Sequence, residues 1–431
     1  MSAPPNAPGT SAPTPGQDPP GQNPPAQGAA GAPASGRRSL FAVLKVVFAV
    51  LVLALVARVI PWRDELTHKS GDAAVTFRGE IVGDWKAPAV RFVFDEAQPV
   101  AELPPALRDV AQGDPALSVE VTRDETTAWR PGMPRAFLDV DPTGLSVALG
   151  MALAGICATA MRWWRLLGAA GCPTGLWPAT RLTFIGFFFN IVVPGLTGGD
   201  LVKAVMVARS HPERRAAAAM SVLVDRLMGV LVLVAMGAVA ILWLGDRFPY
   251  PREPILIGLA LGAGGLFAYA SPSLRRRIGF ERLLARLPMA STLKQIDDAL
   301  VVCARKPREL AWAMFFSLFN QTCVMGALIA LGASFGETAL DVANYVVVGS
   351  IGNLVSAIPL TPGGVGVAET VYGELFELQG GSWTLGFAVA IAWRLCMVTA
   401  GLCGGLFLLT PGGRLTAAER AQLEGASGPA K

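Results

Sequence analysis

The sequence predicts an all-α polytopic membrane protein with six spanning helices, two re-entrant hairpins made of broken helices, and a small extracytoplasmic β-rich insertion. Hydrophobic residues make up 52% of the chain and charged residues 16%, whereas soluble domains carry about 25% charged residues. Several apolar runs approach the roughly 20 residues that a bilayer span needs. Two further apolar segments are interrupted by glycine and proline, which hydrocarbon tolerates only where the broken backbone is buried or wet.

The N-terminal part predicts a tail and one span. Residues 1–36 consist mainly of Pro, Gly, Ala, Ser and Gln with almost no charge. Such a segment cannot bury enough surface to fold, so we expect a disordered cytoplasmic tail. Residues 37–60 begin with two arginines and continue as an apolar run, which predicts the first transmembrane helix. The long preceding tail and the missing A-x-A site favour a retained span over a cleaved signal.

Residues 61–144 are polar and acidic. They hold nine basic and fifteen acidic residues, a net charge of −6, which leaves +10 for the rest of the chain. Alternating or β-branched segments predict strands in AVTFRGEIVG, VRFVFDE, LSVEVTR and RAFLDVD. We expect a small extracytoplasmic β domain, a sandwich or an SH3-like barrel, without a catalytic constellation.

Residues 145–410 predict the main transmembrane domain, with a cytoplasmic tail at 411–431. Five spans are expected here, at 145–161, 216–244, 254–271, 310–333 and 382–410. The loop at 272–309 carries nine bases against four acids, which marks it as cytoplasmic. Both termini then lie in the cytoplasm.

Tryptophans agree with this topology. They fall at the expected outer boundary (Trp62, Trp243, Trp383) and at the inner one (Trp163, Trp164, Trp177, Trp312). An arrangement with eight full spans keeps both termini inside. It would put one flank of each broken segment on the wrong side, so we rank it second.

The two broken segments, 187–215 and 344–376, share a loose pattern. In each, an asparagine precedes a glycine- and proline-rich break and an acid follows it: Asn190, Pro194, Gly198, Gly199 and Asp200 in the first, and Asn353, Pro359, Pro362, Gly363, Gly364 and Glu369 in the second. Basic residues flank the first segment and acids the second, so we expect the hairpins to enter from opposite sides. Paired interrupted segments point to a transporter-type binding site.

Polar residues within the broken segments and expected spans are the candidate substrate-binding residues: Asn190, Asp200, Lys203, Asp225, Arg226, Asn353, Glu369 and Arg394. An intramembrane arginine costs roughly 3 kcal/mol unless it is paired or hydrated. One interpretation pairs Asp225 or Glu369 with an arginine, for example Asp225 with Arg394. The other has the arginines hold an anionic group in a wet cavity, because the guanidinium fork suits phosphate. Lys203 either adds a cation near the cytoplasmic mouth or extends to the interface.

Metal and triad chemistry find no support in the sequence. Six scattered cysteines and two distant histidines lack metal or triad spacing. The glycine-rich segments are not nucleotide loops, because no strand precedes them and no Lys-Ser/Thr follows. We expect no cofactor, no metal, no catalytic residue and no nucleic-acid partner.

Five pieces occur in order across 145–410: RWWRLL (162–167), NIVVPGLTGGDLVKA (190–204), SVLVDRLMGV (221–230), IPLTPGGVGVAE (358–369) and Arg394. Together they resemble the membrane domain of the lysylphosphatidylglycerol synthase family, also found alone in flippase-like proteins. The resemblance implies a membrane domain proposed to move aminoacylated or other phospholipids between leaflets. The full synthases add a C-terminal aminoacyltransferase domain; about twenty residues follow the last expected span here, so we expect this chain not to carry out aminoacyl transfer alone. The insertion at 61–144 departs from relatives that join their first two spans by a short loop.

We therefore expect a flippase-like protein of the cell membrane that moves a phospholipid or other anionic lipid through a central polar cavity, with membrane lipids as its partners. Two other classes remain open. A membrane transferase would use Asp200, Asp225 or Glu369 as a base, although no second catalytic group accompanies these acids. A non-transporting scaffold would bind an envelope partner through 61–144.

Overall fold

The computed structural model describes residues 60–70, 73–95, 118–123, 126–192, 198–245, 306–356 and 366–408, together with a few isolated positions. The chain divides into two units, Met1–Val47 and Phe48–Lys431, and the described residues belong to the second. Several expectations lie outside the described residues. These are both tails, the spans at 37–60 and 254–271, and the break residues Pro194, Pro359, Pro362, Gly363 and Gly364.

The insertion contains a five-stranded antiparallel sheet in the order β4-β3-β2-β1-β5. Its strands are β1 (Asp64–Ser70), β2 (Ala73–Val82), β3 (Ala89–Phe94), β4 (Ser118–Thr122) and β5 (Thr127–Arg130). Alternate side chains of β3 are buried, as a sheet with one apolar face requires. Aromatic residues dominate that face, with Phe77 and Phe92 packed edge-on against Phe94.

One predicted strand is wrong. RAFLDVD contributes instead to helix α3 (Met133–Leu138) and the turn after it. Proline near the start of the helix favours helical backbone there, and the buried Met133 and Ala136 follow helical rather than alternating spacing. The buried carboxylate of Asp64 fixes this helix to the sheet, because it accepts hydrogen bonds from the amides of Ile81 and Gly132 and from Arg135.

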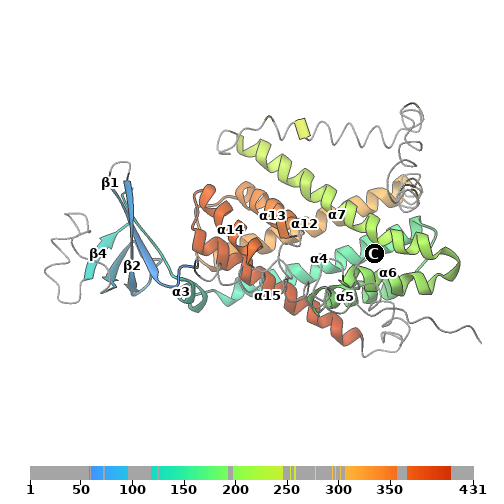
Figure 1. The fold of residues 1–431 in the computed structure, drawn as a ribbon, viewed down its shortest axis with the longest axis horizontal. Coiled ribbons are helices and arrows are strands. Elements are labelled where there is room, and N and C mark those ends of the chain that lie inside the picture. Colours follow the sequence, from blue (N-terminus) through green and yellow to red (C-terminus); the bar gives the residue numbers. More distant parts are fainter. Residues whose placement is uncertain are drawn as a thin grey trace, which may run out of the picture. The chain divides into compact units, whose positions relative to one another are not determined.

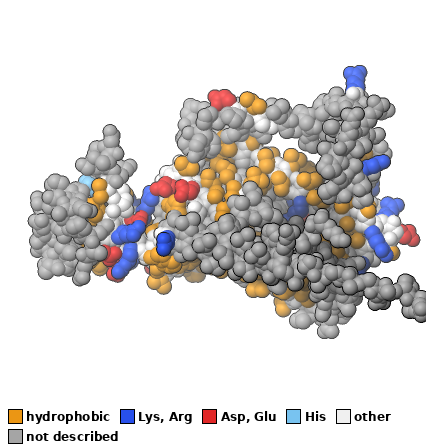
Figure 2. All heavy atoms as spheres, viewed as in Figure 1, with side chains coloured by type: hydrophobic (Ala, Val, Ile, Leu, Met, Phe, Trp, Pro, Cys, Tyr) orange, Lys and Arg blue, Asp and Glu red, His pale blue; other side chains and the backbone are white. Residues whose placement is uncertain are grey.

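Among the described residues, four helices are long and apolar enough to cross a membrane: α4 (Pro142–Ala169), α7 (Arg215–Leu244), α12 (Pro307–Ser334) and α15 (Trp383–Phe407). They coincide with four of the expected spans. Their outward faces carry large exposed apolar side chains, such as Leu231, Phe319 and Leu402. On the face shown in Figure 2, the described side chains over the helices are mainly hydrophobic, which suits contact with lipid.

Two pairs of shorter helices lie between these spans (Figure 1). The first pair is α5 (Leu176–Val192) and α6 (Gly198–Ser210), and the second is α13 (Val342–Ser356) and α14 (Val367–Leu378). The members of each pair pack against one another. In the first pair the contact is close, because a Cβ on Gly199 would lie 1.8 Å from the carbonyl oxygen of Gly186. A glycine is therefore required at this crossing.

Candidate functional site

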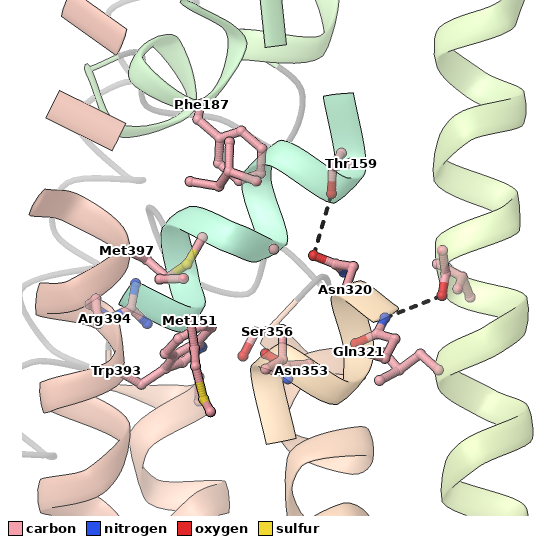
Figure 3. A pocket seen from close by; sticks show the side chains of 18 of the residues that line it. Met151, Thr159, Phe187, Asn320, Gln321, Asn353, Ser356, Trp393, Arg394 and Met397 are labelled. Carbon is pink, nitrogen blue, oxygen red and sulfur yellow. Dashed lines mark hydrogen bonds between the residues drawn. The ribbon is translucent and has the colours of Figure 1, made fainter. Parts of the chain in front are cut away.

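A cavity of about 370 Å³ lies among α4, α7, α12, α13, α14 and α15, with Phe187 of α5 at its edge. Its size is in the range of small-ligand pockets. Much of the wall is apolar, including Met151, Val324 and Trp393. The charged residues of its lining are Arg162, Arg226, Glu369 and Arg394. Figure 3 shows Asn320, Asn353 and Ser356 on one side of the space and Arg394 with Met397 on the other.

Arg394 on α15 forms an ion pair with Glu369 on α14 through its Nε. The acid stands in the first turn of α14, where its other carboxylate oxygen accepts the amide of Gly366 at 2.7 Å. Glu369 thus both caps its helix and neutralises the arginine. Its side chain is buried, whereas that of Arg394 keeps about a third of its surface open (32%).

Arg226 on α7 makes the corresponding contact with Asp200 in the first turn of α6. Its Nη2 lies 2.5 Å from the Asp200 carboxylate. The guanidinium has five N–H donors, and Asp200 is its one ion-pair partner among the described residues. The side chain of Arg226 is 44% exposed. Donors on the cavity side of Arg226 are therefore placed to meet a bound group.

A second set of charges is almost completely enclosed, and of its members Arg162 also lines the cavity. Arg162 on α4 donates from Nε to Asp225 on α7 at 2.7 Å and from Nη1 to Ser317 on α12 at 3.1 Å. Lys203 on α6 lies 3.8 Å from the same carboxylate and 3.8 Å from the ring centre of Trp163. A buried charge needs such partners to remain ionised. Asp225 therefore joins three helices to one another.

Uncharged polar groups occupy the middle of the cavity. Thr159 on α4 donates to the Asn320 side chain on α12 at 3.4 Å, and Gln321 donates to the carbonyl oxygen of Gly229 on α7 at 3.4 Å (Figure 3). These amides sit near mid-length of α12, where a lipid-facing side chain would be apolar. The cavity can therefore offer both charged and neutral hydrogen-bonding groups to a ligand.

The candidate residues fall into two groups. Arg226, Asn353, Glu369 and Arg394 line the cavity, and Asp200 is paired to one of them. Asn190 lies where α5 and α6 cross, and its side chain accepts a hydrogen bond from the amide of Gly199 at 2.9 Å. The described part of the chain contains no group of three His, Cys, Asp or Glu side chains that could hold a metal.

Three expectations are corrected by the geometry. Asp225 pairs with Arg162 and Lys203, not with Arg394. Lys203 is buried rather than extended to an interface. Trp163 is also fully buried, with its indole N–H donated to Ser221 at 3.1 Å, so it does not belong to an interfacial aromatic belt.

Arg162 is a charged cavity residue that was not among the candidates from the sequence. It directly follows the expected span 145–161, but α4 continues to Ala169. The available signal was the sequence RWWRLLGA, which keeps its helical apolar character for about two more turns.

Comparison with known proteins agrees with this architecture. A family model described as the lysylphosphatidylglycerol synthase TM region matches residues 132–405. A UPF0104 membrane protein of Pyrococcus horikoshii is 23% identical over 313 residues, which cover 65% of this chain and 92% of that protein. The family match includes both pairs of shorter helices and the four long helices up to residue 405. The chain therefore belongs to the lysylphosphatidylglycerol synthase transmembrane-region family.

Proposed function

We propose that this protein moves an anionic phospholipid between membrane leaflets, with the lipid headgroup passing through the cavity and its tails remaining in the bilayer. A volume of about 370 Å³ suits a phosphate-bearing headgroup but not two acyl chains. The observation that carries the proposal is the charge balance at the cavity. Its wall presents three arginines and one glutamate among the described residues.

The surplus of positive charge remains when the enclosed charged residues are included in the count. Arg162, Lys203, Arg226 and Arg394 face Asp200, Asp225 and Glu369 within the network of described ion pairs. Four bases against three acids leave one positive charge. In a low-dielectric interior an uncompensated cation is costly. A phosphodiester supplies the single negative charge that would balance it, and the guanidinium fork matches its two free oxygens.

The test is lipid movement in reconstituted liposomes. Acyl-labelled phosphatidylglycerol and phosphatidylcholine are followed by chemical quenching of the outer leaflet, with and without an imposed ion gradient. We expect the anionic lipid to move faster than in protein-free vesicles and faster than the zwitterionic lipid. Arg394→Lys should reduce this rate about tenfold, because lysine keeps the charge but loses the two-pronged hydrogen bond, worth about 1.5 kcal/mol or more.

Arg165→Lys is the matched control. Arg165 also pairs with an acid, Glu309 at 3.4 Å, but stands near the end of α4 and is not part of the cavity wall. Its substitution should leave lipid movement unchanged. Rates equal to those of protein-free vesicles for every lipid and gradient, or a wild-type rate for Arg394→Lys, would overturn the proposal.

A further inference from the structure

Apart from the short α3 and a 3-10 turn at Pro212–Arg214, the described helices form two sets of four. In chain order α4, α5, α6 and α7 have 28, 17, 13 and 30 residues. The second set, α12, α13, α14 and α15, has 28, 15, 12 and 25 residues. Each set is a long helix, a pair of short helices and a second long helix. The correspondence suggests a repeat, which the contacts between helices can test.

The packing follows the same rule in both sets. Within each set the two short helices contact one another and the last short helix contacts the final long one. Between the sets, α5 packs on α15 as α13 packs on α7 (Figure 1). Likewise α4 contacts α7 and α15 as α12 contacts α15 and α7. Exchange of the two sets therefore leaves this pattern of helix contacts unchanged, as a two-fold axis would.

The two sets run in opposite directions. The first helices of the sets, α4 and α12, are antiparallel partners. At one end of the pair Arg165 lies 3.4 Å from Glu309, and at the other the amide of Asp141 donates to the carbonyl oxygen of Ser334 at 3.2 Å. A two-fold axis perpendicular to this pair relates helices of opposite direction. The repeat is thus inverted, an arrangement typical of transporters.

The same ion pair occurs at equivalent positions of both sets. Asp200 is in the first turn of α6 and pairs with Arg226 of α7, 26 residues later. Glu369 is in the first turn of α14 and pairs with Arg394 of α15, 25 residues later. Each pair joins the second short helix to the final long helix. Arg226 and Arg394 line the same cavity.

We infer that Asp200–Arg226 and Glu369–Arg394 are equivalent gates at the starts of α6 and α14, and that they open in alternation so that the cavity faces one side at a time. The inference rests on the proposed function, since it describes how the same cavity would be reached. An incoming phosphate competes with the carboxylate for the arginine, so the ligand lowers the cost of breaking the pair it meets. The other pair then still closes the cavity.

The two gates differ in their neighbours. Asp225 precedes Arg226 and belongs to the enclosed Arg162–Lys203 set, whereas Trp393 precedes Arg394. Three residues after each acid, Lys203 and Tyr372 are both buried, but only the first is charged. The two ion pairs therefore occupy equivalent positions in different surroundings, and breaking one need not cost the same free energy as breaking the other. Each gate has to be tested separately.

Sided chemical labelling tests the inference. Val324 lines the cavity from α12, and Val324→Cys is placed in a background without the native cysteines. A charged, membrane-impermeant thiol reagent is applied to right-side-out and to inside-out vesicles. We expect Asp200→Asn to raise the labelling rate at least threefold from the cytoplasmic side, where the first hairpin is expected to enter. Glu369→Gln should raise it by a similar factor from the outside.

Second variants guard against misfolding. Arg226→Gln and Arg394→Gln break the same pairs from the other partner and should reproduce the sidedness. The exchange Asp200→Arg with Arg226→Asp restores an ion pair of reversed polarity and should return labelling toward the wild-type rate. The Glu369→Gln side chain keeps an oxygen that can accept the Gly366 amide, so the cap of α14 is kept.

The outcomes separate the gates from the transport function, because labelling needs no lipid substrate. Increased labelling from the same side in both variants, or no change in either, would overturn the alternating gates even if lipid movement is measured in the same vesicles. Opposite sidedness without any lipid movement would support the gates and overturn the proposed function.

Discussion

Arg162 and Asp225 form a 2.7 Å ion pair in which both side chains are nearly excluded from solvent, at 4% and 1% exposure. The pair joins α4 to α7, and Lys203 brings α6 to the same carboxylate. Asp225 stands next to Arg226 in the sequence, yet adjacent helical residues point about 100° apart. The two neighbours accordingly serve different partners.

Removal of the acid alone should be more damaging than removal of the pair. Asp225→Asn leaves Arg162 and Lys203 buried without their counter-charge, for which we expect a loss of about 3–5 kcal/mol. The double variant Arg162→Gln with Asp225→Asn removes one of the cations as well and should be milder. Thermal unfolding in detergent measures both. Equal destabilisation by Glu309→Gln, whose pair is about 30% exposed, would argue against burial as the cause.

The packing of α5 against α6 should be lost when a side chain is added at their crossing point. A Cβ on Gly199 would meet the backbone oxygen of Gly186 at 1.8 Å and the Asn190 side chain at 2.7 Å. Replacement of Gly198-Gly199 by Leu-Leu should therefore separate α5 from α6 and abolish lipid movement, while membrane insertion, measured by fractionation, is retained. Full transport in this variant would remove the hairpin from the mechanism.

The α5–α15 contact should be equally intolerant of a side chain. Gly404 allows a close approach, since a Cβ there would lie 2.0 Å from the carbonyl oxygen of Phe184. Backbone cannot move aside as a side-chain tip can, so Gly404→Ala should cost about 1–3 kcal/mol. Gly150→Ala is the control, because nothing lies within 4 Å of its added Cβ. A similar fall in unfolding temperature for both would contradict the packing argument.

The sheet should be less stable near neutral pH than in mild acid because of Glu65. Burial raises the pKa of this carboxyl above its ordinary 4.5, although Arg78 and Arg130 lie opposite it on neighbouring strands. A raised pKa in the folded state means that the penalty is absent below the ordinary pKa and appears as pH rises through the raised value. Glu65→Gln should therefore stabilise the protein at pH 7 and reduce the pH dependence of unfolding between these two values. An unchanged pH profile would exclude Glu65 as its source.

The orientation of the chain can be checked with two further cysteines. The acidic insertion and the basic loop 272–309 predict that they lie on opposite sides. In intact cells an impermeant reagent should label Thr126→Cys and miss Ser291→Cys. Labelling of position 291 from outside would require a different topology.

The sequence predicted helices and strands well where one physical constraint decides the structure of a segment. Four long apolar runs became helices α4, α7, α12 and α15, because a segment in hydrocarbon must satisfy its own backbone hydrogen bonds. Strands β2, β3 and β4 were predicted from their alternation. Strand β1 was missed because DELTHKS is mostly polar and its pairing with both neighbours decides its conformation.

Partners of buried charges could not be assigned from spacing. Asp225 was one residue from one arginine and 169 residues from another, but its partner proved to be Arg162, 63 residues away on α4. Which helix lies beside which is decided by packing between distant segments, such as α4 with α12, and not by local pattern. The acids and arginines could be selected as candidates, whereas their pairing required the fold.

The packing of α5 against α15, two helices far apart in the sequence, has a consequence for how the protein is made. A ribosome completes α5 at residue 192 but does not begin α15 until residue 383. During the intervening synthesis the surface of α5 around Phe184 lacks the glycine-bearing helix that will cover it. Contacts so distant in sequence form late. The packing of α5 can therefore be completed only after the last helix has been synthesised.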